Sequence, residues 1–535
     1  DTTLGPVVAE AVRADLGQSP VVSVVSTQTV SAALQRMQRA PNARVDTALA
    51  RDIAKREGIK AIVGGDVHSV GNGFIVTMRL VSADSGRELA SLSESADGVK
   101  DLIPTIGKMT RQLRRRMGES LKHVQASAVL ADVTTSSLPA LQKYTEGSRL
   151  NATGGDEDKA IALLKEAVSI DTSFAMAYRA LAVILSNRGL DREAQIRYIE
   201  KAYAHADRLP PIEKYLATAT YWTNGPRPDL AKAAQAYESL LVVNPTHAGA
   251  LNNLALLDAQ RRDFTTAEQL LRRAIKANPQ SVVAYGNLMA YAAEQGNAAL
   301  ADSIYRAQLT ASNNSPRVAA GRATLLFARG RYDSATTFID SLARTNPGDE
   351  VTEQAKLGIH EANSMVHGKL TAALALGNQR TAYAEKHGVA GATLGATFDS
   401  AMVEAWYRGH KEKALQLVNA GLQRTPLSSL PPLERPFASL AEVYAFAGRA
   451  DLARVMLAKF DSIAHTMSPA AAAATRHSIN SAIAMAEHRY LDAAHEAQAS
   501  STGPCTVCAT PTIAIAYDFA QQPDSAIREF TKYVE

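Results

Sequence analysis

Small and apolar residues recur along most of the chain with a period of about 34 residues. The clearest marker is a small residue followed by apolar positions at helical spacing, as in the stretch TTAEQLLRRAIKANP around Ala267. With short insertions between units, this small residue recurs at Ala160, Ala194, Ala233, Ala267, Ala301, Ala335, Ala373, Ala414, Ala453, Ala493 and Ala526. The recurrence predicts about eleven repeated units between residues 141 and 535.

Each unit contains two amphipathic segments, which predict two helices. In the unit that begins at Ala248, Leu251 and Leu254 mark one face of the first helix, and Ala267 and Leu271 mark the second. Several units place a glycine at the turn between the helices, at Gly189, Gly330, Gly368, Gly409 and Gly448. Glycine suits this turn because a residue that ends a helix often has a positive φ. The sequence therefore predicts a mainly α fold of helix-turn-helix units.

The first 125 residues lack this period and predict a different domain. Their pattern predicts a helix from Leu4 to Leu16, a strand at VVSVVS (21–26), helices near 28–39 and 45–57, and a long helix over 98–124. Three strands, KAIVGGDVHSV, GFIVTMRLVS and RELASLSES, lie between these helices and are joined by turns typical of hairpins. We expect a small α/β domain over residues 1–125 with a mostly antiparallel sheet, and a linker over 126–140.

The 34-residue period, with its small residue early in each second helix, resembles the tetratricopeptide repeat family. The resemblance covers about residues 141–535. It implies a right-handed superhelix of about eleven units that binds a protein or peptide partner. The last unit stops at Glu535, and no polar capping helix follows Tyr533, so we expect the chain to be a fragment.

The amino-terminal region resembles the small amino-terminal domain of the TolB protein and its relatives in bacterial regulators. The matching pieces are Leu4-Gly5, Gly58-Ile59, AIVGGDV and FIVTMRLVSADSG. Relatives begin with one more apolar strand, which would lie before Asp1, so we expect this first strand to be missing. The domain order is similar to the non-catalytic region of bacterial membrane-anchored Ser/Thr kinases and related regulators. The resemblance implies a place on the extracytoplasmic side of the cell envelope, with an anchor outside this chain. A cytoplasmic place is the alternative.

Composition and motifs exclude several classes of function. The 57 Lys and Arg nearly balance the 53 Asp and Glu, so the chain lacks the basic field of a nucleic-acid-binding protein. The sequence has no Gly-rich loop followed by Gly-Lys-Ser/Thr, no kinase catalytic loop and no pair of histidines at metal-binding spacing. The glycines of GGDVHSVGNG fall in a strand and hairpin, where turn geometry explains them. We expect no catalytic residue, no metal and no cofactor, and we expect that this chain itself is not an enzyme.

Two further clusters leave alternatives open. Cys505 and Cys508 form a C-x-x-C pair, which fits a local disulfide in an exported protein, two reduced thiols, or half of a zinc site completed by nearby histidines. The arginines of RQLRRRMGESLKHV fit a membrane-surface role or an ordinary solvated helix face. The helical spacing favours the solvated face.

The repeats themselves supply the candidate binding surface. A stripe on the first helices lies opposite the face that packs on the second helices, and we expect it to line an inner groove. Its candidate partner-binding residues are Trp222, Asn252, Asn253, Leu256, Asn287 and Arg317. Asn suits an extended peptide because its amide both donates to and accepts from a backbone. The alternative is that Asn253 bonds only to neighbouring helices.

Three functions follow from these observations. The first is a protein-interaction scaffold or sensor region of a bacterial signalling protein. The second is the non-catalytic part of a Ser/Thr kinase whose catalytic domain precedes Asp1. The third is a structural subunit of an envelope or surface assembly. The sequence does not identify the partner or the oligomeric state.

Overall fold

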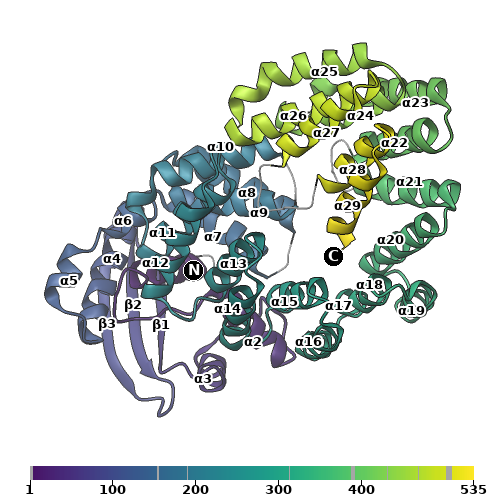
Figure 1. Ribbon diagram of the computed structural model, residues 1–535. Coiled ribbons are helices and arrows are strands. Elements are labelled where there is room, and N and C mark those ends of the chain that lie inside the picture. Colours follow the sequence, from purple (N-terminus) through teal and green to yellow (C-terminus); the bar gives the residue numbers. More distant parts are fainter. Residues whose placement is uncertain are drawn as a thin grey trace. The chain divides into compact units, whose positions relative to one another are not determined.

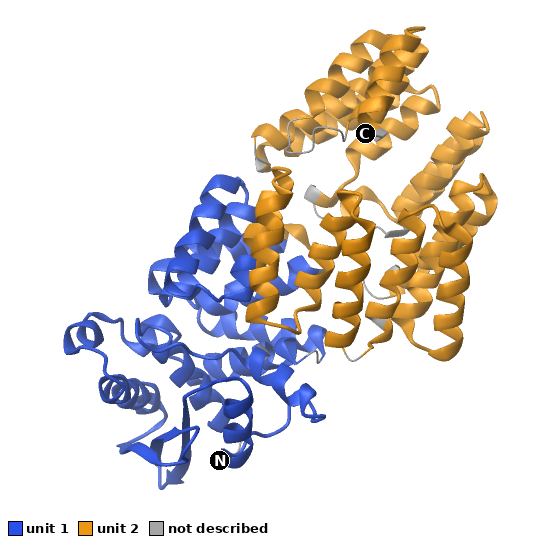
Figure 2. Cartoon of the chain, turned by 60° about the horizontal axis from the view of Figure 1, so that its bottom comes forward, with its two compact units in different colours: residues 1–188, 194–251 blue, residues 189–193, 252–535 orange. Residues whose placement is uncertain are grey.

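The computed structural model describes residues 4–153, 156–188, 191–312, 314–386, 392–430, 432–467, 469–501 and 509–534. The chain divides into two compact units (Figure 2). Unit 1 comprises Asp1–Arg188 and Ala194–Leu251, and unit 2 comprises Gly189–Glu193 and Asn252–Glu535.

The amino-terminal part of unit 1 holds the sheet of the described chain (Figure 1). Its elements are α1 (Leu4–Leu16), α2 (Thr27–Arg36), α3 (Thr47–Arg56), β1 (Ala61–Val70), β2 (Gly73–Ser82), β3 (Glu88–Ala96), α4 (Val99–Arg116), α5 (Leu121–Ala126) and α6 (Leu130–Val133). The three strands are antiparallel neighbours in the order β1-β2-β3. The three predicted strands, their hairpins and the α/β character of this region are confirmed.

One face of this sheet forms a core and the other faces solvent. Val76, Met78 and Leu80 are buried on one face of β2, whereas Ile75 and Arg79, on the other face, are exposed. Helix α4 covers the buried face by packing on β2 and β3, and it also packs on α1. This alternation is the period-2 pattern of a one-sided antiparallel sheet.

Two predictions for this region were wrong. Residues 21–26 form no strand, because no described strand lies beside them to supply a ladder of hydrogen bonds. The predicted helix over 98–124 ends at Arg116, and α5 begins only at Leu121. Gly118 has a φ of +94° in this break, a conformation that cannot continue a right-handed helix. The segment 126–140, expected as a linker, contains α6 with buried Leu130 and Val133.

The rest of the described chain consists of eleven consecutive helix pairs. The pairs are α7 (Leu138–Ala152) with α8 (Glu157–Ile170), α9 (Ala175–Arg188) with α10 (Arg192–Ala204), α11 (Pro211–Asn224) with α12 (Leu230–Val243), α13 (Ala248–Gln260) with α14 (Phe264–Ala277), α15 (Val282–Glu294) with α16 (Ala298–Ala311), α17 (Pro316–Ala319) and α18 (Gly321–Ala328) with α19 (Tyr332–Thr345), α20 (Glu350–Val366) with α21 (Leu370–Lys386), α22 (Ala392–Met402) with α23 (Lys411–Arg424), α24 (Phe437–Phe446) with α25 (Ala450–Ile463), α26 (Pro469–Ala486) with α27 (Tyr490–Ser500), and α28 (Thr510–Phe519) with α29 (Pro523–Val534). The predicted mainly α fold of about eleven helix-turn-helix units is confirmed.

The small residue that marked each unit is buried in every repeat. All eleven marker alanines, from Ala160 to Ala526, are between 0% and 4% exposed. Each lies in the first turns of a second helix, where a larger side chain would hold the two helices apart. The register derived from the sequence is therefore correct in every repeat.

Most described turns between paired helices contain a left-handed residue. Gly330, Gly368, Gly409 and Gly448 have φ values between +67° and +76°. Where a repeat lacks glycine the conformation persists, as at Gln521 with a φ of +59°. Glycine adopts this region without the steric cost that other residues incur, which explains its recurrence at the turn.

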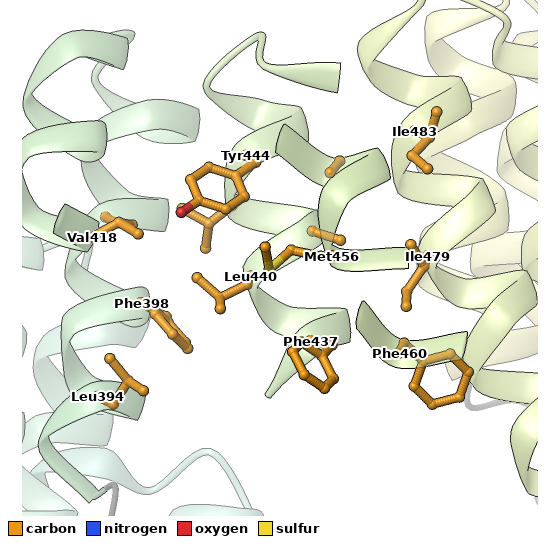
Figure 3. Packing of buried hydrophobic residues seen from close by; sticks show 14 of the residues in the cluster. Leu394, Phe398, Val418, Phe437, Leu440, Tyr444, Met456, Phe460, Ile479 and Ile483 are labelled. Atoms are coloured by element: carbon orange, nitrogen blue, oxygen red, sulfur yellow. The ribbon is translucent and has the colours of Figure 1, made fainter. Parts of the chain in front are cut away.

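A hydrophobic core in the later repeats joins first and second helices of successive pairs (Figure 3). Phe398, Val418, Leu440 and Met456 lie in it and come from four consecutive helices, α22 to α25. An aromatic contact also links distant repeats in unit 2. The ring centroid of Trp406 lies 4.4 Å from that of Phe446 and 5.6 Å from that of Phe519 in α28.

Candidate functional site

Three asparagine side chains form a hydrogen-bonded chain across two first helices of unit 2. Asn287 Nδ2 on α15 donates to Asn252 Oδ1 on α13 at 2.9 Å. Asn252 Nδ2 donates in turn to Asn253 Oδ1 at 3.1 Å. The bonds set the orientation of the amides, so the candidate binding residues of adjacent repeats are held as one polar row.

Exposure differs along this asparagine row. Asn252 is only 8% exposed and acts as the buried bridge between the two helices. Asn253, Leu256 and Asn287 are half-buried, so part of each side chain still reaches solvent. Within the described residues, no hydrogen bond to Asn287 Oδ1 is present. This oxygen is an available acceptor for a backbone N–H of a partner.

Trp222 belongs to unit 1, where its ring joins an aromatic cluster. Its ring centroid lies 4.9 Å from that of Tyr221 and 6.1 Å from that of Tyr203 on α10. Lys232 Nζ on α12 lies 4.1 Å from the same centroid, within the range of a cation–π interaction. Trp222 therefore contributes to the packing of three helices of unit 1.

Three other predicted residues are described only in part or not at all. The backbone of Arg317 lies in α17, but its side chain is outside the described residues. Cys505 and Cys508 also lie outside the described residues.

One buried carboxylate of unit 2, Glu404, was not predicted from the sequence. Glu404 lies in a π-helical segment, Val403–Tyr407, and its side chain is 4% exposed. It accepts hydrogen bonds from Arg408 Nη1 at 2.6 Å, His410 Nδ1 at 2.8 Å and Lys413 Nζ at 2.9 Å. The hydrogen bonds from Lys413 and His410 lower the pKa of Glu404 to about 2. We call these four residues the Glu404 hub. A Glu followed within nine positions by an arginine, a histidine and a lysine was the signal in the sequence.

The expectation that the arginines of α4 form a solvated face was wrong for Arg114. This side chain is 0% exposed and donates to Glu119 through Nε at 2.9 Å and Nη2 at 2.6 Å. Its Nη1 lies 3.9 Å from Asp15 Oδ1 on α1. Hydrogen bonding from Arg114 lowers the pKa of Glu119, whereas burial raises the pKa of Asp15. Arg114 thus joins α4, α1 and the turn before α5 from inside the core.

No group of three or more His, Cys, Asp or Glu side chains within the described residues is arranged to hold a metal ion. Among the described helices, none is both long and apolar enough to cross a membrane.

The paired helices, with a buried alanine early in every second helix, define a helical repeat protein built from helix-turn-helix units. No protein-family model matches the chain, and no curated protein sequence matches it. Among solved structures, it is similar to a tetratricopeptide repeat protein from Parabacteroides merdae, at 17% identity and a TM-score of 0.33 over 54% of this chain and 100% of that one. It is also similar to Cut9 in the APC/C Cut9–Hcn1 hetero-tetramer, at 13% identity and a TM-score of 0.35 over 74% of this chain and 73% of that one.

A third similar structure is human IFIT1, solved as a dimer with m7Gppp-AAAA, at 14% identity and a TM-score of 0.33 over 82% of this chain and 94% of that one. All three TM-scores are below 0.5, so the assignment to helical repeats rests on the helix pairs and their register.

Proposed function

We propose that this chain is a protein-interaction scaffold that binds an extended segment of a partner along the inner face of its first helices. The observation that supports this most is the asparagine row of Asn253, Asn252 and Asn287. Amides held in one direction across adjacent repeats suit the evenly spaced N–H and C=O groups of an extended backbone.

Within the row, the residues have different roles in the proposal. Asn287 accepts from the partner backbone through Oδ1, and the half-buried Leu256 supplies an apolar contact one turn further along α13. Asn252 keeps the two helices in register and does not itself contact the partner, because it is buried. Trp222 and Arg317, which the sequence predicts for the same stripe, stay candidate partner-binding residues, each on its own helix.

The biological setting of the scaffold is part of the proposal and rests on the resemblance stated above. We place the chain in a bacterial signalling protein of the cell envelope, with the TolB-like region preceding the repeats. The sequence of the gene upstream of the codon for Asp1 tests this placement. A kinase domain followed by a membrane anchor supports it, and an unrelated enzyme in that position contradicts it.

The binding surface is tested on the full chain with peptides selected from a random display library of extended, uncharged 12-residue sequences. Replacing Asn253 and Asn287 together by Ala removes two neutral hydrogen bonds, each worth about 0.5–1.5 kcal/mol. We expect the affinity of the selected peptides to fall by about ten- to a hundredfold while thermal unfolding changes little. Asn378→Ala is the matched control, because Asn378 is exposed on the second helix α21.

The dependence of peptide affinity on salt concentration distinguishes binding through the asparagine row from binding driven by charge. The row contains no charged side chain, so affinity should change little between low and high ionic strength. A steep fall in affinity with salt, or an undiminished affinity of the double variant, would show that the partner uses another surface.

A further inference from the structure

The helix pair α20–α21, inside unit 2, has almost no buried core of its own (Figure 1). Each helix is 17 residues long, yet of their described side chains only Thr352 and Ala373 are buried. The shorter pair α24–α25 buries a much larger apolar set: Phe437, Leu440, Ala441, Val443, Tyr444, Ala445, Ala453, Met456 and Phe460. Because apolar burial is the main stabilising contribution to a repeat, α20–α21 should be the less stable of the two pairs.

The apolar cores on either side of this pair do not continue through it. The core before it contains Ile339 of α19 and extends only as far as the half-buried Ala355 and Ile359 of α20. The core after it begins at Leu394 of α22 and continues into the following pairs. Of the described residues of α21, none belongs to either core. Helix α21 therefore lies between two separate apolar cores.

Polar contacts take the place of an apolar core between α20 and α21. Arg380 Nη1 donates to Glu361 Oε2 at 2.6 Å. Tyr383 Oη donates to Glu350 Oε2 at 2.9 Å. The side chains of Arg380 and Glu361 are 48% and 27% exposed, so water and salt screen their attraction. Such contacts stabilise the pair much less than a buried core does.

A glycine inside each helix weakens the pair further. Gly358 lies in α20 and Gly377 in α21, where glycine lowers helix stability relative to alanine. A Cβ at Gly377 would lie 2.9 Å from Glu361 Oε1, so this glycine makes room for the carboxylate. A Cβ at Gly358 would lie 3.8 Å from the guanidinium of Arg380, which is an ordinary contact distance. Alanine therefore fits at Gly358 without displacing a neighbour.

We propose that α20–α21 is a conformational joint of unit 2, a helix pair that opens locally while the helices before and after it stay folded. In a helical repeat array, stability is a sum over the repeats and their interfaces, so the pair with the weakest contacts opens at the lowest free energy. Opening leaves the core around Ile339 and the core that begins at Leu394 intact, because neither includes α21. The two cores are then free to move relative to each other.

Amide hydrogen exchange of the full chain, resolved by helix, tests the proposal. The protection factor of each helix is the intrinsic exchange rate divided by the observed rate. We expect protection factors at least tenfold lower in α20 and α21 than in α24 and α25.

The variant Gly358→Ala distinguishes local from global opening. Alanine is the better helix former, so the protection of α20 and α21 should rise about fivefold. Protection of α24 and α25 should stay unchanged, because local opening of the joint does not expose their amides. Opening of unit 2 as a whole would instead raise the protection of all four helices by the same factor.

The variant Glu361→Gln tests the polar contact between the two helices. It removes the ion pair with Arg380, so the protection of α20 and α21 should fall about two- to fivefold. The matched control is Glu385→Gln, which removes the same charge from an exposed side chain in the last turn of α21. This control should not lower the protection of either helix, because a negative charge at a helix C-terminus is not stabilising.

Three results would overturn the proposal. The first is equal protection of α20–α21 and α24–α25 in the unaltered chain. The second is a rise in protection of equal size in all four helices of the Gly358→Ala variant. The third is a loss of protection with Glu385→Gln as large as that with Glu361→Gln, because the contact between α20 and α21 would then not control the opening.

Discussion

Replacing Glu404 by Gln isolates the contribution of one buried charge to the stability of the later repeats. Gln keeps the shape of the side chain and an acceptor oxygen, but it removes the negative charge that Arg408, His410 and Lys413 share. The π-helical segment before Gly409 and the first turn of α23 are joined through this carboxylate. Loss of the charge should therefore loosen the turn between α22 and α23 first.

The pKa of Glu404 sets the size of the effect. The fall from the usual 4.5 to about 2 corresponds to about 3 kcal/mol of preference for the ionised form in the folded chain. Lys413 and His410 are 56% and 60% exposed, so solvent screens part of this interaction. We expect Glu404→Gln to lower the free energy of unfolding by about 1–2 kcal/mol at pH 7.

The pH dependence has a definite sign. Because the folded pKa is lowered, the stabilisation by Glu404 is complete above pH 4.5 and is lost as the pH falls toward 2. Amide hydrogen exchange of α22 and α23, measured at several pH values, reports this locally. The difference between the unaltered chain and Glu404→Gln should shrink as the pH falls below 4.5.

The control is Glu412→Gln on α23, where the side chain is exposed and the expected change is close to zero. If Glu404→Gln leaves exchange at α22 and α23 unchanged at pH 7, the hub does not stabilise the turn. A difference of constant size down to pH 3 would show that its effect comes from packing and not from charge.

Three further outcomes are expected. Ala267→Leu should overpack the crossing of α13 and α14 and lower the free energy of unfolding by about 1–3 kcal/mol, measured by urea denaturation; unchanged stability would contradict the register. Glu119→Gln should cost about 3–5 kcal/mol, because it leaves the buried guanidinium of Arg114 without its bidentate carboxylate, and a thermal shift as small as that of a surface variant would refute this. In an exported protein Cys505 and Cys508 should be oxidised to each other, and two alkylated thiols in unreduced native protein by mass spectrometry would contradict both the disulfide and the envelope location.

The repeat register could be predicted from sequence because it depends on one dominant requirement. A crossing of two helices tolerates only a small side chain, and this requirement returns at every unit from Ala160 to Ala526. The turn between helices is equally local, since it needs one left-handed residue. Periodic and local patterns of this kind can be recognised in a single sequence.

Features that depend on non-periodic contacts were missed. The charge of Arg114 predicted a solvated side chain, but Glu119 and Asp15 compensate it inside the core. The strand predicted at residues 21–26 had a composition typical of strands, but a strand also needs a neighbouring strand with which its backbone forms hydrogen bonds. Asn252 was predicted as a groove residue from its position on the helix, yet its hydrogen bond to Asn287 places it in a buried bridge. Each of these depends on which residues meet in space.

The contact between Trp406 and Phe519 changes how a linear array responds to load. In a solenoid whose repeats touch only their neighbours, a pulling force unravels the terminal repeat first and proceeds one repeat at a time. Here the ring of Phe519, at the end of α28, contacts the ring of Trp406, which follows α22. The ring centroid of Phe519 also lies 5.4 Å from that of Tyr490. The repeats between Trp406 and Phe519 are therefore held together at both ends of the segment. We expect them to unfold together in a single step of a force–extension trace.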